Sequence, residues 1–495
     1  MSGLYQAMPL WVLLSSLLAA AVILALGEDH PRLRIGINLA AALLKLVLVG
    51  VMLLGVRAGH EFLLRVPLMP GIDLVLHADA LSMLFISLSA LLWLATTIYA
   101  IAYLEDSPNR ARFFGFFSLC VAATMGIATA GNLFTFFLFY EMLTLSTWPL
   151  VVHRGTEKAM RAGRGYLWYT LGGSAVLLLG IVLLHGLAGS QDFVAGGTLE
   201  AWVDRHPLAL TGIFLLLIAG MGVKAALAPV HGWLPTAMVA PAPVSALLHA
   251  VAVVKAGAFG IVRVVYDVYG IDLMQDLGLA QLLAVMASIT IIYGSLRAIW
   301  QTDLKRRLAY STVSQVSYIA LGVALANPLA SIGGLVHLVH QGLMKITLFF
   351  CAGCYAETHG IHAIKDLDGI GRRMPWTTAM FTLGALGMIG LPPLAGFISK
   401  WYLGLGAVAA GQFWVVGVLL ASTVLNAIYF LPILHRVWFR PPRDEQTEGL
   451  AEAAPGLLGP TLFAGFAALA AGLFAGVDWS PLAWVELLVE REYSP

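Results

Sequence analysis

The most informative stretch of the chain, residues 221–260, reads MGVKAALAPVHGWLPTAMVAPAPVSALLHAVAVVKAGAFG. It joins two apolar segments through a region with four prolines, and each segment carries one lysine, Lys224 or Lys255. A proline removes a backbone hydrogen-bond donor and clashes with the preceding turn, so the first segment must end or break there. A lysine within a membrane helix is a functional candidate by default, because its charge is costly in hydrocarbon. The stretch therefore predicts a broken membrane helix with functional lysines on both sides of the break.

The composition extends this interpretation to the whole chain. Of the 495 residues, 60% are hydrophobic and 11% are charged, whereas about a quarter of the residues in a soluble domain are charged. Within hydrocarbon only helices and closed barrels satisfy their backbone groups, and the long apolar runs lack the two-residue alternation of barrel strands. We therefore predict an all-α integral membrane protein. The net charge of +1 argues against a nucleic-acid partner.

About fourteen segments are long enough to cross a bilayer, which requires roughly 18 or more apolar residues. The predicted spans cover residues 10–26, 35–56, 80–103, 113–130, 133–151, 166–187, 208–228, 244–266, 277–299, 308–326, 332–354, 376–407, 413–434 and 457–474. The seventh and twelfth spans contain prolines, at Pro229 and at the Pro392–Pro393 pair. We therefore expect broken helices at these two positions.

The two breaks indicate an internal repeat. Spans 4–8 and spans 9–13 each hold five helices, and each set has a lysine near a proline break, Lys224 or Lys400. Because five is odd, successive repeats have inverted topology, as is common in transporters. The predicted organisation is three N-terminal helices in residues 1–110, a first five-helix repeat in 111–271, a second inverted repeat in 272–440, and a last helix in 441–495.

The basic residues of the loops indicate the orientation of the chain. Cytoplasmic loops hold an excess of lysine and arginine. The predicted loops after spans 1, 3, 5, 9, 11 and 13 hold eighteen of the 28 basic residues. The opposite side holds five, which are Arg57, Arg65, Arg205, Arg263 and Arg491. This alternation supports the count of spans and predicts a multi-pass protein with both termini on the non-cytoplasmic face.

Ionisable side chains occur where hydrocarbon is expected. Histidine titrates near neutrality, and a lysine can do so when burial and a nearby carboxylate act on it in opposite directions. Such groups, linked by water, can pass protons in sequence. The candidates for a proton relay are Glu141, Lys224, Lys255, His337, His340 and Lys400, with His231, His249 and Lys345 in supporting positions.

Structural roles stay open for these residues. Lys224 can reach an interface with its long side chain. Glu141 and Lys255 can belong to an ion pair that only stabilises the protein, and the histidines of the row can be ordinary core residues. Lys45 lies in the middle of the second predicted span, and no partner for it is evident.

Cofactor chemistry has little support in the sequence. Cys351 and Cys354 form a C-x-x-C pair, but no second pair completes a zinc site. No Gly-rich loop ending in Lys-Ser or Lys-Thr occurs, so direct use of ATP is unsupported. We expect neither a cofactor nor a metal ion.

Residues 221–260 resemble the proton-conducting, antiporter-like membrane subunits of respiratory complex I, Mrp-type cation/proton antiporters and membrane-bound hydrogenases. The likeness covers about residues 113–440. GRRMP at 371–375, LPPLAGFISKWYL at 391–403 and NAIYFLPI at 426–433 look most like the D-type subunit of Mrp antiporters. The absence of an acidic residue from the sixth span favours the same type.

The resemblance implies a role for each residue of the row. In order along the path these are the pair Glu141 and Lys224, the central group Lys255, the connecting residues His337 and His340, and the terminal Lys400. It also implies lateral packing against sibling membrane subunits, with function only in the assembled complex.

Three functions are open at this point. The first is a subunit of a multisubunit antiporter that exchanges Na⁺ or K⁺ for protons, which is a secondary transporter rather than an enzyme. The second is a proton-pumping subunit of a complex I-like oxidoreductase or a membrane-bound hydrogenase, with the redox centre in another subunit. The third is a structural subunit whose ion pairs hold a complex together.

Overall fold

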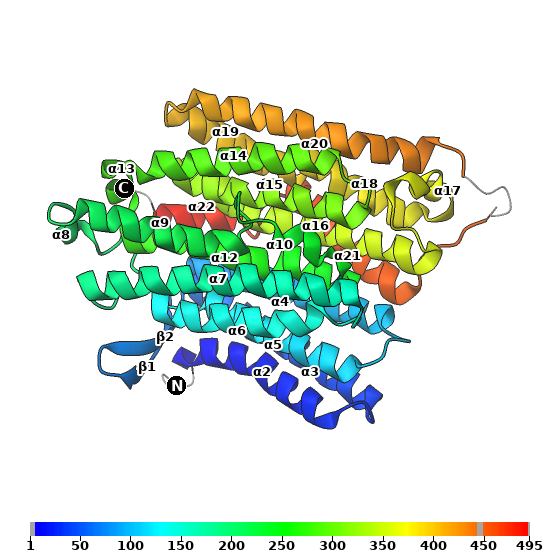
Figure 1. Ribbon diagram of the computed structural model, residues 1–495, viewed down its shortest axis with the longest axis horizontal. Helices are drawn as coiled ribbons and strands as arrows, with labels where there is room; N and C mark the ends of the chain where they lie inside the picture. Colours follow the sequence, from blue (N-terminus) through cyan, green and yellow to red (C-terminus); the bar gives the residue numbers. More distant parts are fainter. Residues whose placement is uncertain (1–4, 443–448, 494–495) are drawn as a thin grey trace.

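A computed structural model describes residues 5–442 and 449–493, which form a bundle of roughly parallel and antiparallel helices (Figure 1). Each predicted span has a helical counterpart in this part of the chain. The long helices are α2 (Met8–Leu26), α3 (Pro31–Arg57), α4 (Ala80–Tyr103), α5 (Arg110–Ala128), α6 (Leu133–Val151), α7 (Glu157–Ala188), α9 (Pro207–Lys224), α14 (Leu279–Ile299), α15 (Leu304–Ala324), α16 (Pro328–His359), α18 (Pro375–Ile389), α19 (Ala395–Ala409), α20 (Phe413–Phe439) and α21 (Pro455–Leu473).

Within the described residues, twelve segments are helical, long and apolar enough to cross a membrane. α15 has 21 residues but carries several hydroxyl side chains and Gln315, and α18 and α19 have only 15 residues each. The predicted helical membrane fold is confirmed. The count of fourteen crossings and the boundaries of the two repeats stay predictions.

Both predicted helix breaks are present. α9 ends at Lys224, and the chain passes through α10 (Trp233–Thr236) and η1 (Ala237–Val239) before the next span begins. α18 ends at Ile389, and α19 begins after the two prolines. The remaining short elements are α8 (Glu200–Val203), α13 (Ile271–Asp276), η4 (Ile364–Leu367), α17 (Ile370–Arg373) and α22 (Pro481–Glu492).

The eighth predicted span is not a regular helix. It consists of α11 (Ala242–Ala246), η2 (Leu247–Val251), α12 (Val253–Arg263) and η3 (Val264–Tyr269), of which η2 and η3 are π-helical. π-Helical turns inside α-helices occur frequently at functional sites. Lys255 lies directly after the first of them.

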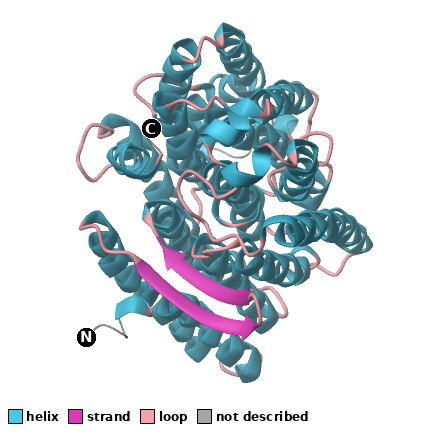
Figure 2. Cartoon of the chain, turned by 90° about the vertical axis from the view of Figure 1, so that its left-hand side faces the viewer, coloured by secondary structure: helices cyan, strands magenta, loops and turns pink. Residues whose placement is uncertain are grey.

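A β-hairpin, which the sequence analysis did not predict, covers one end of the bundle (Figure 2). Its strands, β1 (Phe62–Met69) and β2 (Ile72–Ala78), are antiparallel. A main-chain hydrogen bond from Gly131 N to Val75 O, 2.9 Å long, fastens the hairpin to the connection between α5 and α6. This side of the molecule is called the hairpin end below.

The described chain begins and finishes at the hairpin end (Figure 1). The Tyr5 ring packs on Phe62 of β1, with ring centroids 4.8 Å apart. Arg491 of α22 donates a hydrogen bond to Val56 O at the end of α3, at 3.2 Å. That both termini share one side agrees with the prediction, and the membrane face to which this side belongs stays a prediction.

α16 lies at the centre of the bundle, and its membrane-spanning window is entirely buried. Two crossings bring its main chain against that of its neighbours. A Cβ atom on Gly322 of α15 would lie 2.6 Å from Gly334 Cα, and one on Gly333 would lie 2.6 Å from Leu403 N of α19. Any larger side chain at these glycines would collide with backbone.

A similar close approach joins the α9 break to α12, where a Cβ on Gly257 would lie 2.2 Å from Ala225 N. We expect Gly257→Ala to lower the free energy of unfolding by about 1–3 kcal/mol, because overpacking forces backbone segments apart. Thermal unfolding of the purified protein measures this change. Gly212→Ala in α9 is the control, since a Cβ there meets nothing within 4 Å. Equal melting temperatures for the two variants would contradict the expectation.

Candidate functional site

Lys224 is the last residue of α9 and is fully buried. Its ammonium group donates a hydrogen bond to the carbonyl oxygen of Tyr140 on α6 and lies 3.3 Å from the centroid of the Tyr140 ring. Glu141 is only partly buried, although its Oε1 is shielded and has no hydrogen-bond partner among the described residues. The expected ion pair between Glu141 and Lys224 is therefore not formed here, and Tyr140 takes the place of the carboxylate.

Lys255 is fully buried in the first turn of α12. Its Nζ donates a hydrogen bond to Leu338 O of α16 at 2.7 Å. Gly257, two residues further along α12, contacts the main chain of the α9 break beside Lys224. α12 thus places Lys255 between the Lys224 break and the central helix.

His337 and His340 lie one turn apart on α16, and both are fully buried. His340 Nδ1 lies 2.9 Å from Ser399 Oγ of α19, whereas its Nε2 has no partner in the described part of the chain. Both ring nitrogens of His337 are likewise unpartnered there, and its ring packs on Tyr318 with centroids 5.1 Å apart. Buried polar atoms of this kind are ordinarily satisfied by ordered water.

Lys400 lies beside the break between α18 and α19. Its Nζ donates hydrogen bonds to Ile389 O at 2.6 Å and to Thr423 Oγ1 at 2.9 Å. Ile389 is the last residue of α18, so its carbonyl has no partner within the helix. The Tyr318 ring, which contacts His337, also lies 5.8 Å from Lys400 Nζ. Tyr318 therefore joins the histidines to the terminal lysine.

Two of the supporting residues are also fully buried near this row. Lys345 of α16 donates hydrogen bonds to Leu308 O, at 3.0 Å, and to Ser311 Oγ. His249 lies in η2 and stacks on Phe349, with centroids 4.5 Å apart, while both its ring nitrogens lack a partner in the described structure. Each extends the set of buried polar groups towards the end opposite the hairpin.

His231 and Lys45 lie apart from the row. His231 occupies the turn after the α9 break and packs edge-on against Tyr293 of α14, with centroids 4.9 Å apart. Lys45 of α3 donates a hydrogen bond to Ser16 Oγ of α2 and faces the Trp93 ring of α4 at 4.6 Å. Lys45 thus has the partner that the sequence could not supply, among the N-terminal helices.

A cavity of about 780 Å³ opens at the end opposite the hairpin. Its lining includes the basic residues Arg154, Lys158, Arg161, Lys305 and Arg306. Lys305 reaches inward and donates hydrogen bonds to Ala240 O, at 2.6 Å, and to Ser245 Oγ, at 3.4 Å. Ser245 lies about one turn before His249, so the Lys305 side chain connects the lining of the cavity to the segment that carries His249.

The structure therefore places Lys224, Lys255, His337, His340 and Lys400, which are called the row below, on neighbouring helices that contact one another. Each step is a contact between α9 and α12, α12 and α16, or α16 and α19. Glu141 lies at one end of the row without bonding to it.

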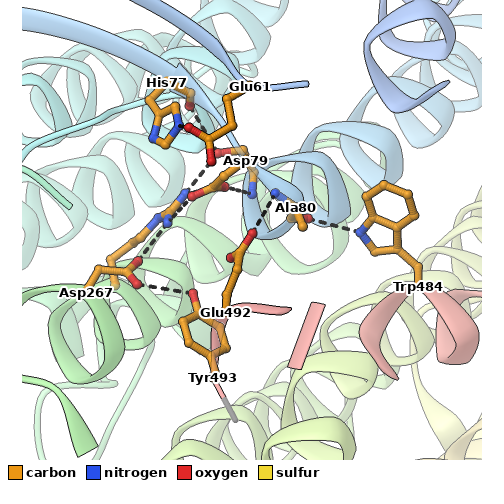
Figure 3. Close-up of polar contacts among 10 residues, drawn as sticks. Glu61, His77, Asp79, Ala80, Asp267, Trp484, Glu492 and Tyr493 are labelled. Carbon is orange, nitrogen blue, oxygen red and sulfur yellow. Dashed lines mark hydrogen bonds and ion pairs between the residues drawn. The ribbon is translucent and has the colours of Figure 1, made fainter. Parts of the chain in front are cut away.

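One group of ionisable residues was missed by the sequence analysis. Arg263, assigned there to the non-cytoplasmic side of the loops, is buried within α12 at the hairpin end. It donates hydrogen bonds to both oxygens of Asp79, at 2.6 and 2.8 Å, and to Asp267 at 2.7 Å (Figure 3). An arginine and an aspartate four residues apart within an apolar span were the available signal.

Residues 130–426 match the family described as "NADH:quinone oxidoreductase/Mrp antiporter, TM", and residues 70–114 match "NADH-Ubiquinone oxidoreductase (complex I), chain 5 N-terminus". The N subunit of an NADH-quinone oxidoreductase from Desulforudis audaxviator is 36% identical over 418 residues, which are 82% of each chain. The D subunit of a Na(+)/H(+) antiporter from Bacillus subtilis is 27% identical over 409 residues, covering 82% of this chain and 81% of the relative. Hydrogenase-4 component B of Escherichia coli is 34% identical over 348 residues, covering 67% of this chain but 50% of the relative.

Two solved structures share the fold. A chain of the Mrp complex from Dietzia sp. superposes with a TM-score of 0.89 at 24% identity, covering 100% of this chain and 98% of that one. A chain of the membrane-bound sulfane sulfur reductase, an archaeal respiratory membrane complex, superposes with a TM-score of 0.86 at 25% identity and 97% coverage of both chains.

The contact between Lys224 and the Tyr140 ring can be tested by removing the ring. We expect Tyr140→Leu to lower the free energy of unfolding by about 2 kcal/mol more than Tyr140→Phe, because a desolvated cation–π contact contributes about that amount. Tyr140→Phe is the matched control, since it keeps the ring and loses only the hydroxyl that bonds Gly220 O at 3.2 Å. Thermal unfolding of both variants measures the difference, and equal stabilities would show that the ring does not stabilise the ammonium.

Proposed function

Because the chain belongs to the NADH:quinone oxidoreductase/Mrp antiporter family of membrane proteins, we propose that it is the proton-conducting subunit of a multisubunit membrane complex. Its relatives named above include subunits of such complexes. The proposed conductor is the row from Lys224 through Lys255, His337 and His340 to Lys400, with Glu141 at its start.

The placement of these ionisable residues on helices that contact one another is the observation that supports the proposal. The row crosses the interior of the bundle from one helix break to the other, and the histidines between the breaks have ring nitrogens free of protein partners in the described structure. A buried group without a function would ordinarily be satisfied or replaced by an apolar one. Imidazoles that keep an unpartnered ring nitrogen between two lysines are instead suited to exchange protons through intervening water.

The way the lysines are held also suits proton transfer. Lys255 bonds a carbonyl oxygen rather than a carboxylate, and so does Lys400. A carbonyl accepts a hydrogen bond from either the ammonium or the neutral amine, so proton loss leaves no unpaired carboxylate buried in the bundle. Glu141 is placed to bias the row, because its charge acts through space on Lys224.

The cavity at the basic end supplies an entry route in this proposal. Lys305 extends from its lining to Ser245, one turn before His249. Lys345 and His249 then continue the polar groups towards Lys255. We place this end on the cytoplasmic face of a bacterial or archaeal cell membrane and both termini outside, in keeping with the predicted distribution of basic loops.

Coupling to Na⁺ or K⁺ exchange is the first form of the proposal. The motifs at 371–375 and 391–403 look most like those of the D-type subunit of Mrp antiporters, and the D subunit of the Bacillus subtilis antiporter is similar to the chain over 82% of its length. Sibling membrane subunits would complete the complex and supply the cation path.

Coupling to redox chemistry is the second form, and a specific observation favours it. The N subunit of a quinone oxidoreductase is 36% identical, against 27% for the D subunit of the antiporter. The two forms differ in their partners, because only the second requires hydrophilic iron–sulfur subunits. Purification of the complex from its native membrane, followed by iron analysis and by cation-driven proton flux without reductant, distinguishes them.

Replacing the central lysine tests the relay that both forms share. We expect Lys255→Ala to reduce proton flux in vesicles carrying the whole complex to the level of protein-free vesicles, because the row is interrupted between Lys224 and His337. Native gels should show an assembled complex. Lys365→Ala, which removes an exposed lysine of η4, is the matched control and should leave flux unchanged. Flux that persists without Lys255 would refute the relay, and loss of assembly together with flux would favour a structural role.

A further inference from the structure

Among the residues that the structure describes, three acids gather around Arg263 at the hairpin end. Besides Asp79 and Asp267, which bond the guanidinium directly, Glu492 reaches the same place from α22 (Figure 3). Its Oε1 accepts a hydrogen bond from Ala80 N at 3.3 Å. Arg263 and both aspartates are buried, whereas Glu492 is partly exposed. Glu492 is thus the member of the cluster that solvent can reach.

α22 is held on the start of α4 by several bonds, so the position of Glu492 is well defined. Trp484 Nε1 donates a hydrogen bond to Ala80 O at 3.0 Å, which means that one residue of α4 is bonded on both sides by α22. Tyr493 OH donates a hydrogen bond to Asp267 Oδ1 at 3.3 Å. The C-terminal end of α22 is therefore part of the cluster.

The negative charges of the cluster exceed the positive ones. If all three acids were ionised, Arg263 would leave two negative charges without a counter-charge. Carboxylates that share a buried site cannot all ionise at neutral pH, so one of them retains a proton. Arg263 bonds both aspartates, and within the described residues no basic side chain bonds Glu492. Glu492 is the acid left to hold the proton.

The surroundings of Glu492 on each neighbouring element add no further base in contact with it. The charged groups that act on it are Asp79 at the start of α4 and Arg263 and Asp267 on α12 and η3. Tyr493 follows it in the chain, and His77 of the hairpin, which pairs with Glu61 at 3.4 Å, acts on Asp79. α16, which packs on α22, has no charged residue in its first two turns. On α3, Arg57 is engaged with Asp478 O at 2.8 Å.

The cluster also lies at the hairpin end of the helices that carry the relay. Arg263 lies eight residues beyond Lys255 on α12, which is about 12 Å along a helix. Tyr266, in the next turn, shares a hydrogen bond with Ser331 of α16, six residues before His337. The two helices that carry the centre of the row thus meet at this acidic site.

We propose that Asp79, Asp267 and Glu492, arranged around Arg263, form a proton-binding site at the hairpin end, through which the relay exchanges protons with the medium on that side. The role of this site in a proton path rests on the proposed function. The ability of the site to bind a proton rests on the cluster alone. Glu492 is the exchanging group, and Arg263 holds the aspartates ionised behind it.

The electrostatics of the two acids outside the membrane spans agree with this assignment. Burial, and then the negative charge of Asp79, raise the pKa of Glu492 from its ordinary 4.5 to about 8. Burial alone would raise the pKa of Asp79, but the Arg263 guanidinium outweighs it and holds that pKa below its usual range. At pH 7 Glu492 therefore holds its proton, and it releases the proton as the pH rises through about 8. The contribution of Glu492 to the free energy of unfolding is greatest below its ordinary pKa of 4.5. It is lost progressively as the pH rises from there to about 8.

Infrared spectroscopy of the assembled complex tests the site directly. We expect a protonated-carboxyl band that disappears as the pH is raised from below to above 8, and that Glu492→Gln abolishes. Glu490→Gln, an exposed acid on the same helix, is the matched control and should keep the band. The same variants in vesicles should differ in how proton flux depends on the pH of the medium at the hairpin end. The change in flux near pH 8 should be lost in Glu492→Gln and kept in Glu490→Gln.

Each readout can overturn the proposal separately. A wild-type complex without a titrating band, or a band that survives Glu492→Gln, excludes the proton-binding site. A flux profile that is unchanged in Glu492→Gln removes the site from the path. The infrared band does not depend on Lys255, so flux that survives Lys255→Ala while the band is intact would refute the relay and leave the proton-binding site standing.

Discussion

The structure depends on bonds between lysines inside the bundle and main-chain carbonyl groups. Lys224, Lys255, Lys345 and Lys400 each donate a hydrogen bond to a carbonyl oxygen of a neighbouring segment, and none of them bonds a carboxylate in the described chain. A carbonyl has two lone pairs, so it can serve a helix and a lysine together. The fold must therefore place each lysine against an accessible carbonyl, which belongs to a helix interior for Lys224, Lys255 and Lys345 and to the end of α18 for Lys400.

Much of this arrangement could be predicted from local sequence. Apolar length located the helices, because crossing hydrocarbon requires about the same number of residues in any chain. Proline placed the two breaks, since it cannot donate to the preceding turn. Charge within an apolar run identified Lys224, Lys255 and the two histidines, and the structure brings them into one row. These features are local, so no knowledge of tertiary contacts was needed.

Features that depend on contacts between distant segments could not be predicted in this way. The partner of Lys224 was expected to be Glu141. In the folded protein Lys224 instead bonds the main-chain carbonyl of Tyr140 and faces the Tyr140 ring, and this depends on how α6 packs against α9. The hairpin was missed because β1 exposes apolar residues and shows no clear alternation. The cluster at Arg263 joins residues 184 positions apart, and only the folded helices bring Asp79 to it.

The glycine crossings of α16 restrict how the protein can move. Main chain touches main chain where Gly334 meets α15 and where Gly333 meets α19, so a translation of the whole helix would open both contacts at once. Packed interfaces of this kind are not continuously deformable. Rocking of one half of the protein against the other would disturb these contacts, whereas rotamer changes and local rearrangement at the two helix breaks would not. The central helix is a fixed frame of reference for those smaller motions.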